Sequence, residues 1–548
     1  MSTERPEIQN SKSRALSPLI LALVLAIGLF CGMNINKEKK DKFSQIFDII
    51  NQDYVDSTRI DLLEENAIDY LLSQLDPHSA YIPAQLSEIN NRQIRGNYLG
   101  LGIEYIQFSD TLFVFNTSEG GPAQKAGIMA GDRLLFAGKV KLTDSMSSTE
   151  IQEAIQGDGR SKLSIKVYRR SKNQYLDFAV PRENIVMNSS EVFYMVNKSL
   201  GYIRLERFSS NTHSEFLKSM NALKAAGMKD LILDLRNNGG GLLSEASAIA
   251  NEFLQKDEVI SYTFGYHRNR NYYRADGNGG FKDGKLVLLI NHNTASASEI
   301  LAGALQDNDR AVIIGNRSFG KGLVQEPFRL SDGAMLRLTI ARYYTPSGRS
   351  IQKAYTKDIE KYRNEIYVRD QSKDTLNPNL DSTIKKEFFS KNGRLLTSGG
   401  GIRPDVVLRD TIPDSTEIEM LMPGLFYSRI FDIYVLDFMS EILKNETKFL
   451  KNEIVFQNEF SISQADVVRF IAVAKKIPYL RGLKYSSKTA DIIRKHLKAA
   501  LAYRLFGEKG RSRIINREEG VFSKTIEVLK KYSQILNINN KKMRRFDY

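Results

Sequence analysis

The pattern of hydrophobic and polar residues changes several times along the chain, and each stretch predicts a different kind of structure. From residue 41 to about 92, apolar residues recur at spacings of three and four, as in FSQIFDIINQDYV and IDLLEENAIDYLLSQL, which predicts helices. The residue before a proline disfavours the α conformation, so Asp76-Pro77 is expected to end the second helix. From about Asn97 to Val180, short β-rich runs such as TLFVFNT and KLSIKVYRR are separated by glycine-rich turns.

Farther along, strands and helices alternate from residue 181 to about 353, which is the pattern of an α/β domain. The runs LILDL and KLVLLIN are apolar throughout, as expected of strands buried on both faces of a sheet. Residues 356–396 are rich in Lys and Asp and show little periodicity, so we interpret them as an insertion. The α/β core resumes at Gly399, and helical periodicity returns after Asp410.

These changes predict a multidomain α/β protein. A chain of 548 residues is too long for one hydrophobic core, so several domains are expected. The predicted parts are a signal or anchor segment (1–40), a helical region (41–95), a β-rich domain (96–180), an α/β core (181–409, with the insertion at 356–396) and a helical C-terminal domain (410–548).

The segment from Ala15 to Met33 contains no charged residue, and its 19 residues would reach roughly 28 Å as a helix, about the thickness of a bilayer's hydrocarbon layer. We predict an uncleaved inner-membrane anchor with the body of the protein in the periplasm. A cleaved signal peptide is the alternative, because a basic start and an apolar middle also define one. A lipid anchor on Cys31 is disfavoured by the bulky residues before it. Each interpretation places the body outside the cytoplasm.

Composition narrows the chemistry. The chain is 42% hydrophobic and 26% charged, which is typical of a folded protein. Cys31 is its one cysteine, which excludes an intrachain disulfide and a cysteine-based metal site. The five histidines are scattered without the spacing of metal ligands. Metal catalysis therefore has little support, and we predict no metal site.

Positive charge is concentrated at the C-terminal end. Residues 471–548 hold 20 Lys and Arg against 6 Asp and Glu, an excess equal to the net charge of +14 of the whole chain. A basic domain can bind nucleic acid, anionic lipid or acidic protein. The export segment argues against nucleic acid. We favour a protein contact, either self-association or an adaptor, over a membrane contact or a merely solvated helical face.

Two segments of the β-rich domain predict a peptide-binding module. Tyr98-Leu-Gly-Leu-Gly-Ile-Glu104 can aim consecutive backbone N–H groups at a carboxylate, and GGPAQKAGIMAGDRLL (120–135) follows with a short helix and a turn. Together they resemble a PDZ domain. That resemblance implies that the backbone amides of Leu101, Gly102 and Ile103 hold the C-terminal carboxylate of a substrate. A small β-domain without a ligand is the alternative.

Three segments of the core carry candidate chemistry. LILDLRNNGGG (231–241) runs from a strand into three glycines, which permit the close backbone approach of an oxyanion hole. NHNTASASEI (291–300) places Ser296 between a strand and a helix, where free N–H groups favour negative charge. In SFGKGLVQ (318–325), burial could lower the pKa of Lys321 to ~7–8, as a general base requires. Taken alone, each has a plainer explanation: a turn, a helix N-cap and a surface lysine.

Taken in order, these segments resemble the carboxyl-terminal processing peptidases, a family of Ser-Lys serine proteases with an embedded PDZ domain. LDPHSAYI (75–82), RYYTPSGRSIQ and GGIRPD belong to the same pattern, which spans roughly residues 45–409. The resemblance implies a ClpP/crotonase-like α/β core, no cofactor, and substrates that are proteins or peptides with free C-termini. It does not extend to the last 138 residues.

The same resemblance assigns roles to residues. Ser296, rather than Ser298, would be the nucleophile, Lys321 the general base, and Gln325 the residue that orients the lysine. The oxyanion donors would be the amides of Ala297 and of Gly240 or Gly241, because this chain reads NNGGG where many members read GNPGG.

Two other functions remain open from the sequence. One is a non-catalytic PDZ scaffold built on a decayed protease core, which the intact Ser296, Lys321 and Gln325 argue against. The other is a histidine-dependent serine hydrolase that uses His292 or His78, which would tolerate the loss of Lys321.

Overall fold

The computed structural model describes residues 22–23, 41–84, 86–87, 95–108, 111–156, 162–355, 358–369, 387–408, 424–426, 428–443, 447–483 and 486–537. Residues 1–75 and 76–548 form two separate compact units. Within the described ranges, no helix is long and apolar enough to cross a membrane. The predicted anchor, residues 15–33, lies outside those ranges except for Ala22 and Leu23.

The first unit holds the predicted N-terminal helices, α2 (Lys42–Asp53) and α3 (Ile60–Ser73). Asp41 begins α2 by accepting a hydrogen bond from the Ser44 N–H at 2.9 Å. Helix α3 ends shortly before Asp76-Pro77, in agreement with the predicted stop.

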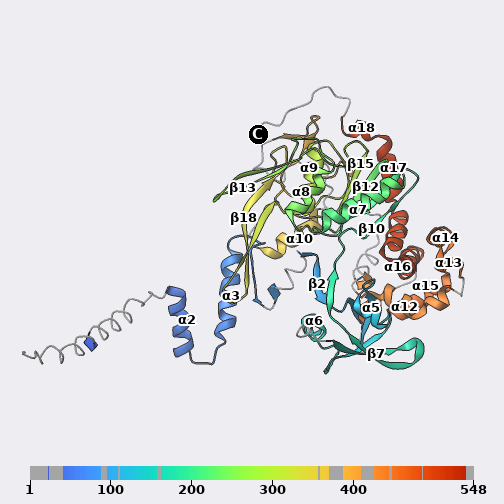
Figure 1. The fold of residues 1–548 in the computed structure, drawn as a ribbon, viewed down its shortest axis with the longest axis horizontal. Coiled ribbons are helices and arrows are strands. Elements are labelled where there is room, and N and C mark those ends of the chain that lie inside the picture. Colours follow the sequence, from blue (N-terminus) through green and yellow to red (C-terminus); the bar gives the residue numbers. More distant parts are fainter. Residues whose placement is uncertain are drawn as a thin grey trace, which may run out of the picture. The chain divides into compact units, whose positions relative to one another are not determined.

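The α/β core is built on a six-stranded sheet with the order β10-β11-β12-β15-β16-β21. Figure 1 labels β10, β12 and β15 of this sheet. Strand β10 is antiparallel to β11, and the other neighbours are parallel. The strands are β10 (Val192–Met195), β11 (Leu200–Arg204), β12 (Asp230–Asp234), β15 (Leu286–Ile290), β16 (Val312–Gly315) and β21 (Val406–Val407).

Helices cover both faces of this sheet. Alternate residues point to opposite sides, so Leu231 and Leu233 of β12 enter one hydrophobic cluster and Ile232 enters another. The first cluster includes side chains of α7 (Thr212–Ala225), α8 (Leu243–Asn251) and α9 (Ala297–Asp307), and the second those of α17 (Val521–Lys530) and α18 (Tyr532–Ile535). Burial on both faces explains why LILDL and KLVLLIN are apolar throughout.

A second sheet has the order β1-β18-β13-β14, and β17 also pairs with β18. Its strand β1 corrects a prediction, because residues 80–82 fall in the stretch that we expected to be helical. They form a strand because they pair with residues 335–337 of β18. The strands are β1 (Ala80–Ile82), β13 (Val259–Gly265), β14 (Arg268–Arg274), β17 (Leu323–Arg329) and β18 (Met335–Tyr344).

Residues 101–180 form a β-module with its own core. Its sheet has the order β3-β4-β5-β7-β8, with β6 beside β5, and two strands that pair with each other, β2 and β9, connect the module to the α/β core. The elements are β2 (Asn97–Gly100), β3 (Ile103–Phe108), β4 (Thr111–Thr117), α5 (Pro122–Ala126), β5 (Arg133–Ala137), β6 (Val140–Lys141), α6 (Ser148–Gln156), β7 (Leu163–Arg169), η1 (Arg170–Lys172), β8 (Gln174–Val180) and β9 (Glu183–Val186).

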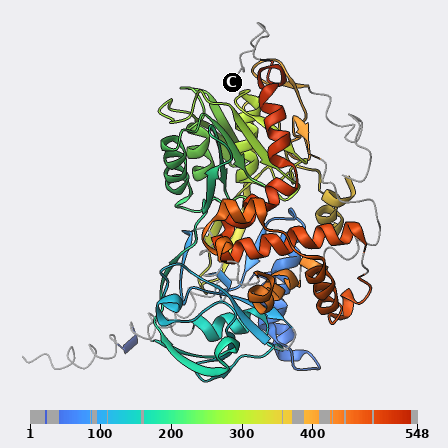
Figure 2. The ribbon, with the colours of Figure 1, turned by 90° about the vertical axis from the view of Figure 1, so that its right-hand side faces the viewer.

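The C-terminal region is helical, as predicted, and has a hydrophobic core of its own. Figure 2 shows these helices in orange and red, and they contact both the β-module and the α/β core. They are α12 (Ile430–Leu443), α13 (Lys448–Lys451), α14 (Glu453–Glu459), α15 (Gln464–Ala474), η3 (Pro478–Leu480) and α16 (Ser487–Glu518), followed by α17 and α18.

The segment interpreted as an insertion, 356–396, contains helix α10 (Ile359–Arg369) and the short strands β19 (Phe388–Phe389) and β20 (Leu395–Leu396). Tyr362 of α10 and Leu396 of β20 are buried, so the described ends of this segment pack into the protein.

Candidate active site

Ser296 lies where β15 has ended and α9 begins. Its backbone adopts φ 57° and ψ −118°, a conformation that is strained for a residue with a side chain. The Ser296 N–H donates to Oε2 of Glu299 at 2.9 Å, which holds the backbone in place. The next N–H, that of Ala297, donates no hydrogen bond within the described residues. The serine is therefore presented on a sharp turn beside an available backbone donor.

Glu299 connects the segment of Ser296 to the segment of Lys321. Its side chain is fully buried, and burial raises the pKa of its carboxyl group. Oε2 accepts from the Ser296 N–H and the Lys321 N–H, each at 2.9 Å. Oε1 accepts from the Ser318 hydroxyl at 2.5 Å and the Gly320 N–H at 2.7 Å. Four donors on one buried carboxylate join two segments that are about twenty residues apart.

Lys321 sits just before strand β17, and its Nζ donates to Oε1 of Gln325 at 2.7 Å. The pKa of Lys321 is lowered from 10.5 to about 8, first by burial and then by the positive charge of Arg337. A lysine with this pKa is partly neutral near neutral pH, and a neutral amine can accept a proton.

Gln325 is held by a hydrogen bond from a distant part of the chain. Its Nε2 donates to the backbone carbonyl of His78 at 2.6 Å. This bond fixes which end of the amide faces Lys321, because an exchanged amide would place an N–H group against the ammonium. Asp76 shapes the turn that carries this carbonyl by accepting from the N–H groups of His78 and Ser79, each at 2.8 Å.

The glycine turn of LDLRNNGGG lies against the start of α9. A Cβ added to Gly240 would lie 2.9 Å from the Ala297 nitrogen, so only glycine permits this approach. The Gly240 N–H already donates to Oδ1 of Asn238 at 2.9 Å. The Phe208 N–H donates to Gly240 O, and the Leu242 N–H donates to Phe208 O, which is the pattern of an isolated parallel β-bridge between Phe208 and Gly241. In this pattern the Gly241 N–H points away from Phe208. Within the described chain, the Gly241 N–H donates no hydrogen bond.

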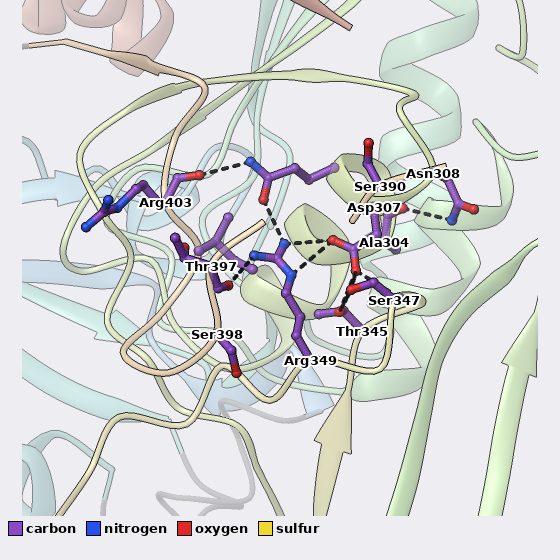
Figure 3. Close-up of polar contacts among 12 residues, drawn as sticks. Ala304, Asp307, Asn308, Thr345, Ser347, Arg349, Ser390, Thr397, Ser398 and Arg403 are labelled. Atoms are coloured by element: carbon purple, nitrogen blue, oxygen red, sulfur yellow. Dashed lines mark hydrogen bonds and ion pairs between the residues drawn. The ribbon is translucent and has the colours of Figure 1, made fainter. Parts of the chain in front are cut away.

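One further motif braces the Lys321 segment. The Gln352 side chain accepts from the Gly322 N–H at 2.8 Å, and the Lys353 N–H donates to Gly320 O at 2.9 Å. The segment that carries these residues is anchored by Arg349, whose buried guanidinium donates to Oδ1 of Asp307 at 2.7 Å at the end of α9 (Figure 3). The motif RYYTPSGRSIQ therefore supports the site without contributing a predicted catalytic group.

The two histidines of the alternative mechanism differ in their surroundings. The ring of His78 bonds through Nε2 to the Tyr362 hydroxyl at 2.8 Å, and the pKa of His78 is lowered to about 4, first by burial and then by the charge of Lys321. His292 follows β15 and is half-buried. No hydrogen bond between Ser296 and a histidine ring occurs within the described residues.

The predicted carboxylate loop of the β-module lies just before the edge strand β3. Its carbonyls are occupied, because Leu101 O accepts from Ala123 N at 3.0 Å and Gly102 O from Ser118 N at 2.9 Å. Gly102 adopts a φ of 69°, and Ile103 begins β3. Over the described ranges, the N–H groups of Leu101 and Gly102 donate no hydrogen bond. The loop thus combines fixed carbonyls with available N–H groups.

Sequence reasoning missed Glu299, Asn238 and the carbonyl of His78. Glu299 had a recognisable signal, because Ser296-Ala-Ser-Glu299 has the S-x-x-E spacing of a capping box at the start of a helix. Asn238 and His78 had none, since their roles depend on contacts with residues far away or on backbone groups.

Comparisons with known proteins identify relatives of two parts of this chain. The family model of peptidase family S41 matches residues 199–361, and that of the PDZ domain matches residues 116–169. A carboxy-terminal-processing protease of Bartonella bacilliformis is 37% identical over 319 residues, which cover 57% of this chain and 72% of that protein. A "Probable CtpA-like serine protease" of Staphylococcus aureus is 30% identical over 359 residues, 63% of this chain and 71% of that protein.

Among solved structures, the photosystem II D1 C-terminal processing protease is similar at 29% sequence identity, with a TM-score of 0.34. The match covers 57% of this chain and 84% of that one. The family matches confirm the predicted class, a multidomain α/β protein with a peptidase core, a PDZ domain (the β-module described above) and a C-terminal helical region.

Proposed function

The chain belongs to peptidase family S41, the carboxy-terminal-processing serine peptidases, and from this premise we propose a Ser-Lys mechanism and a substrate class for it. Ser296 is the nucleophile, Lys321 the general base, and Gln325 the residue that orients the base. The observation that carries this proposal is the environment of Lys321. The lysine is half-buried and bonded to a neutral amide, and burial lowers its pKa to about 8. Such a lysine is suited to accept a proton rather than to form a surface ion pair.

In the first half of the reaction, neutral Lys321 takes the proton of the Ser296 hydroxyl while Oγ bonds to the carbonyl carbon of the scissile peptide. The resulting oxyanion accepts hydrogen bonds from the Ala297 N–H and from a glycine N–H. Of the two candidates, Gly241 is favoured, because Asn238 occupies the Gly240 N–H. The C–N bond then breaks, and the lysine ammonium gives its proton to the leaving amine, which leaves an acyl-enzyme.

In the second half, a water molecule gives a proton to neutral Lys321 and attacks the ester carbon. The Ser296 Oγ leaves and takes the proton back from the lysine, and the new C-terminus departs as a carboxylic acid that ionises in water. Gln325 accepts a hydrogen bond from Nζ in both halves, so the lysine keeps its place whether it is neutral or charged.

The substrate class follows from the PDZ module. We assign the N–H groups of Leu101, Gly102 and Ile103 to the C-terminal carboxylate of a polypeptide, whose last residues would add a strand to the edge of β3. Substrates are then proteins with free, accessible C-termini. We place the reaction outside the cytoplasm on the basis of the apolar segment 15–33, either anchored in the inner membrane or exported after cleavage of that segment.

The experiment is the cleavage of an unfolded protein substrate by purified protein, with the new C-termini identified by mass spectrometry. Wild-type protein should cut, and Ser296→Ala should not. His292→Ala is the matched test of the histidine mechanism and should keep most of the activity. A wild-type protein that binds the substrate without cutting it would favour the scaffold function. Loss of activity in His292→Ala with full activity in Lys321→Ala would overturn the Ser-Lys assignment.

The rate of cleavage should rise with pH through about 8, because Lys321 must be neutral to act as a base and neutral lysine increases as pH rises through its pKa. A rate that instead rises through a pKa near ~6.5 and is then flat would point to a histidine base.

A further inference from the structure

The PDZ module is connected to the peptidase core by two short strands. Strands β2 and β9 pair only with each other among the described strands, over residues 97–100 and 183–186. An isolated two-stranded ribbon is marginally stable and does not by itself fix the orientation of the module that it carries. A further contact with the rest of the chain is needed if the carboxylate loop of the module is to keep a constant distance from Ser296.

The C-terminal helices supply a second attachment. Tyr503 of α16 stacks on Phe115 of β4 with ring centroids 5.1 Å apart and planes at 7°, and its hydroxyl accepts from the Asn116 amide at 2.9 Å. The Arg504 guanidinium lies 4.4 Å from the Phe115 ring centroid and donates to the Phe115 carbonyl. Ile433 of α12 packs against Phe115 as well. These contacts leave the outer edge of β3 unpaired by any described strand.

The same helix then contacts the peptidase core. Gly507 interrupts α16 with φ 69° and ψ −166°, and directly after it Glu508 pairs with Arg204 at 3.1 Å. Two turns later, Asn516 accepts from Arg236 at 2.5 Å. Arg236 lies two residues before Asn238, the residue that holds the glycine turn beside Ser296. The two parts of α16, on either side of Gly507, thus connect the PDZ sheet to the segment that carries the oxyanion glycines.

We propose that helix α16 fixes the distance between the carboxylate loop of the PDZ module and Ser296, and so determines how many residues from its C-terminus a substrate is cut. This inference rests on the proposed function. An extended peptide advances ~3.3 Å per residue. A fixed distance between the carboxylate loop and Ser296 therefore selects a narrow range of fragment lengths. A module that swings on the β2–β9 ribbon by several ångströms would spread the cut over several residues.

The experiment uses the full chain and a series of unfolded polypeptides that share the same last ten or so residues. Mass spectrometry of the released C-terminal fragments gives their length distribution. The wild-type protein should release fragments within a window of about two or three residues. Tyr503→Leu, which keeps an apolar side chain but removes the stack and the hydrogen bond, should at least double that window, and Asn116→Ala should also widen it.

Tyr479→Ala is the matched control, because Tyr479 is an exposed tyrosine of the same helical domain and lies outside the PDZ contact. It should leave the window unchanged. A short amidated peptide, which offers no carboxylate to the module, should be cut by Tyr503→Leu at a rate within about twofold of wild type. This second measurement distinguishes a change in the position of the PDZ module from damage to the active site.

Each remaining outcome decides a different point. Equal windows for wild type and a folded Tyr503→Leu protein would overturn the inference, as would a broad window for the wild type itself. A wild-type protein that cuts nothing would overturn the proposed function instead. If Tyr503→Leu fails to fold, Asn116→Ala, which removes one partly exposed hydrogen bond from the PDZ side, decides the question alone.

Discussion

Two places where distant parts of this chain meet, the catalytic segments around Glu299 and the PDZ contact around Tyr503, are held by different kinds of interaction. Around Glu299, a fully buried carboxylate takes four hydrogen bonds, and a buried Arg349–Asp307 pair anchors the neighbouring loop. Around Tyr503, the contact is an aromatic stack with one hydrogen bond from Asn116 and one from Arg504 to the Phe115 carbonyl. Tyr503 and Asn116 are only half-buried.

The difference lies in what happens when one contact is lost. A buried polar group that loses its partner has no water to replace it, so damage at the catalytic segments should be large and should spread. A half-buried contact can exchange its partner for water, so changes at the PDZ contact should be small and local. The contacts around Glu299 therefore hold the catalytic segments in one geometry. The position of the PDZ module, in contrast, can change at a small cost in free energy.

The largest expected effect tests the chemistry of the catalytic side. Lys321→Ala and Lys321→Arg should each lower kcat by ~10³-fold or more, because removal of a catalytic base costs this much and arginine stays charged below pH ~12. The fold should persist, as judged by circular dichroism. Activity above a few per cent in a folded Lys321→Arg protein would contradict the assignment.

The second effect tests how tightly the catalytic segments are joined. In Glu299→Gln, either orientation of the amide turns an NH₂ group toward two of the four donors. Each unsatisfied buried donor costs ~1–3 kcal/mol, so the segment should open more easily by ~2 kcal/mol or more. Hydrogen exchange at residues 318–322 measures this. Glu326→Gln, at an exposed ion pair on β17, is the matched control and should change exchange little.

The third effect concerns the pKa of the base. Gln325→Glu places a carboxylate beside Nζ, and an adjacent negative charge raises the pKa of a lysine by ~1 unit or more. The rise of rate with pH should therefore move from about 8 to a higher pH, with a loss of roughly tenfold or more at pH 7. Gln325→Ala should lower the rate without a comparable upward move. An unchanged pH profile in Gln325→Glu would contradict the proposed role of Gln325 beside Lys321.

The fourth effect moves to the PDZ module. In the Ser296→Ala background, a fluorescent peptide with a free apolar C-terminus should bind about tenfold or more tightly than its amidated form, because the amide group has no negative charge for the loop of N–H groups. Fluorescence anisotropy measures both affinities. Equal affinities would mean that the module binds internal segments or no peptide.

The smallest expected effect tests the PDZ contact around Tyr503. Tyr503→Phe keeps the stack and removes only the hydrogen bond with Asn116, so it should weaken the PDZ contact by ~1 kcal/mol or less. Hydrogen exchange in β4 should quicken slightly, while the cleavage of a short amidated peptide stays the same. An increase in hydrogen exchange in β4 as large as the one expected at residues 318–322 in Glu299→Gln would show that the two regions do not differ in this way.

The sequence by itself determined the chemical groups and their local placement. Ser296 at a strand-to-helix junction, three glycines after a buried strand and apolar runs for strands covered on both faces are local patterns, because each depends on residues close in the chain. The resemblance to the peptidase family joined these segments in order, and the family matches confirmed the class of fold and of enzyme. The catalytic roles of Ser296, Lys321 and Gln325 stay predictions until the variants are measured.

Only the tertiary structure decided the environment of those groups. The pKa of Lys321 depends on burial and on Arg337, and the orientation of Gln325 depends on a carbonyl 247 residues away. The strand at residues 80–82 exists because β18 pairs with it. The C-terminal helices, for which we predicted a protein contact, also cover the sheet and the PDZ module of the same chain. Burial and long-range pairing are properties of the folded chain, and no local pattern of residues encodes which partners they bring together.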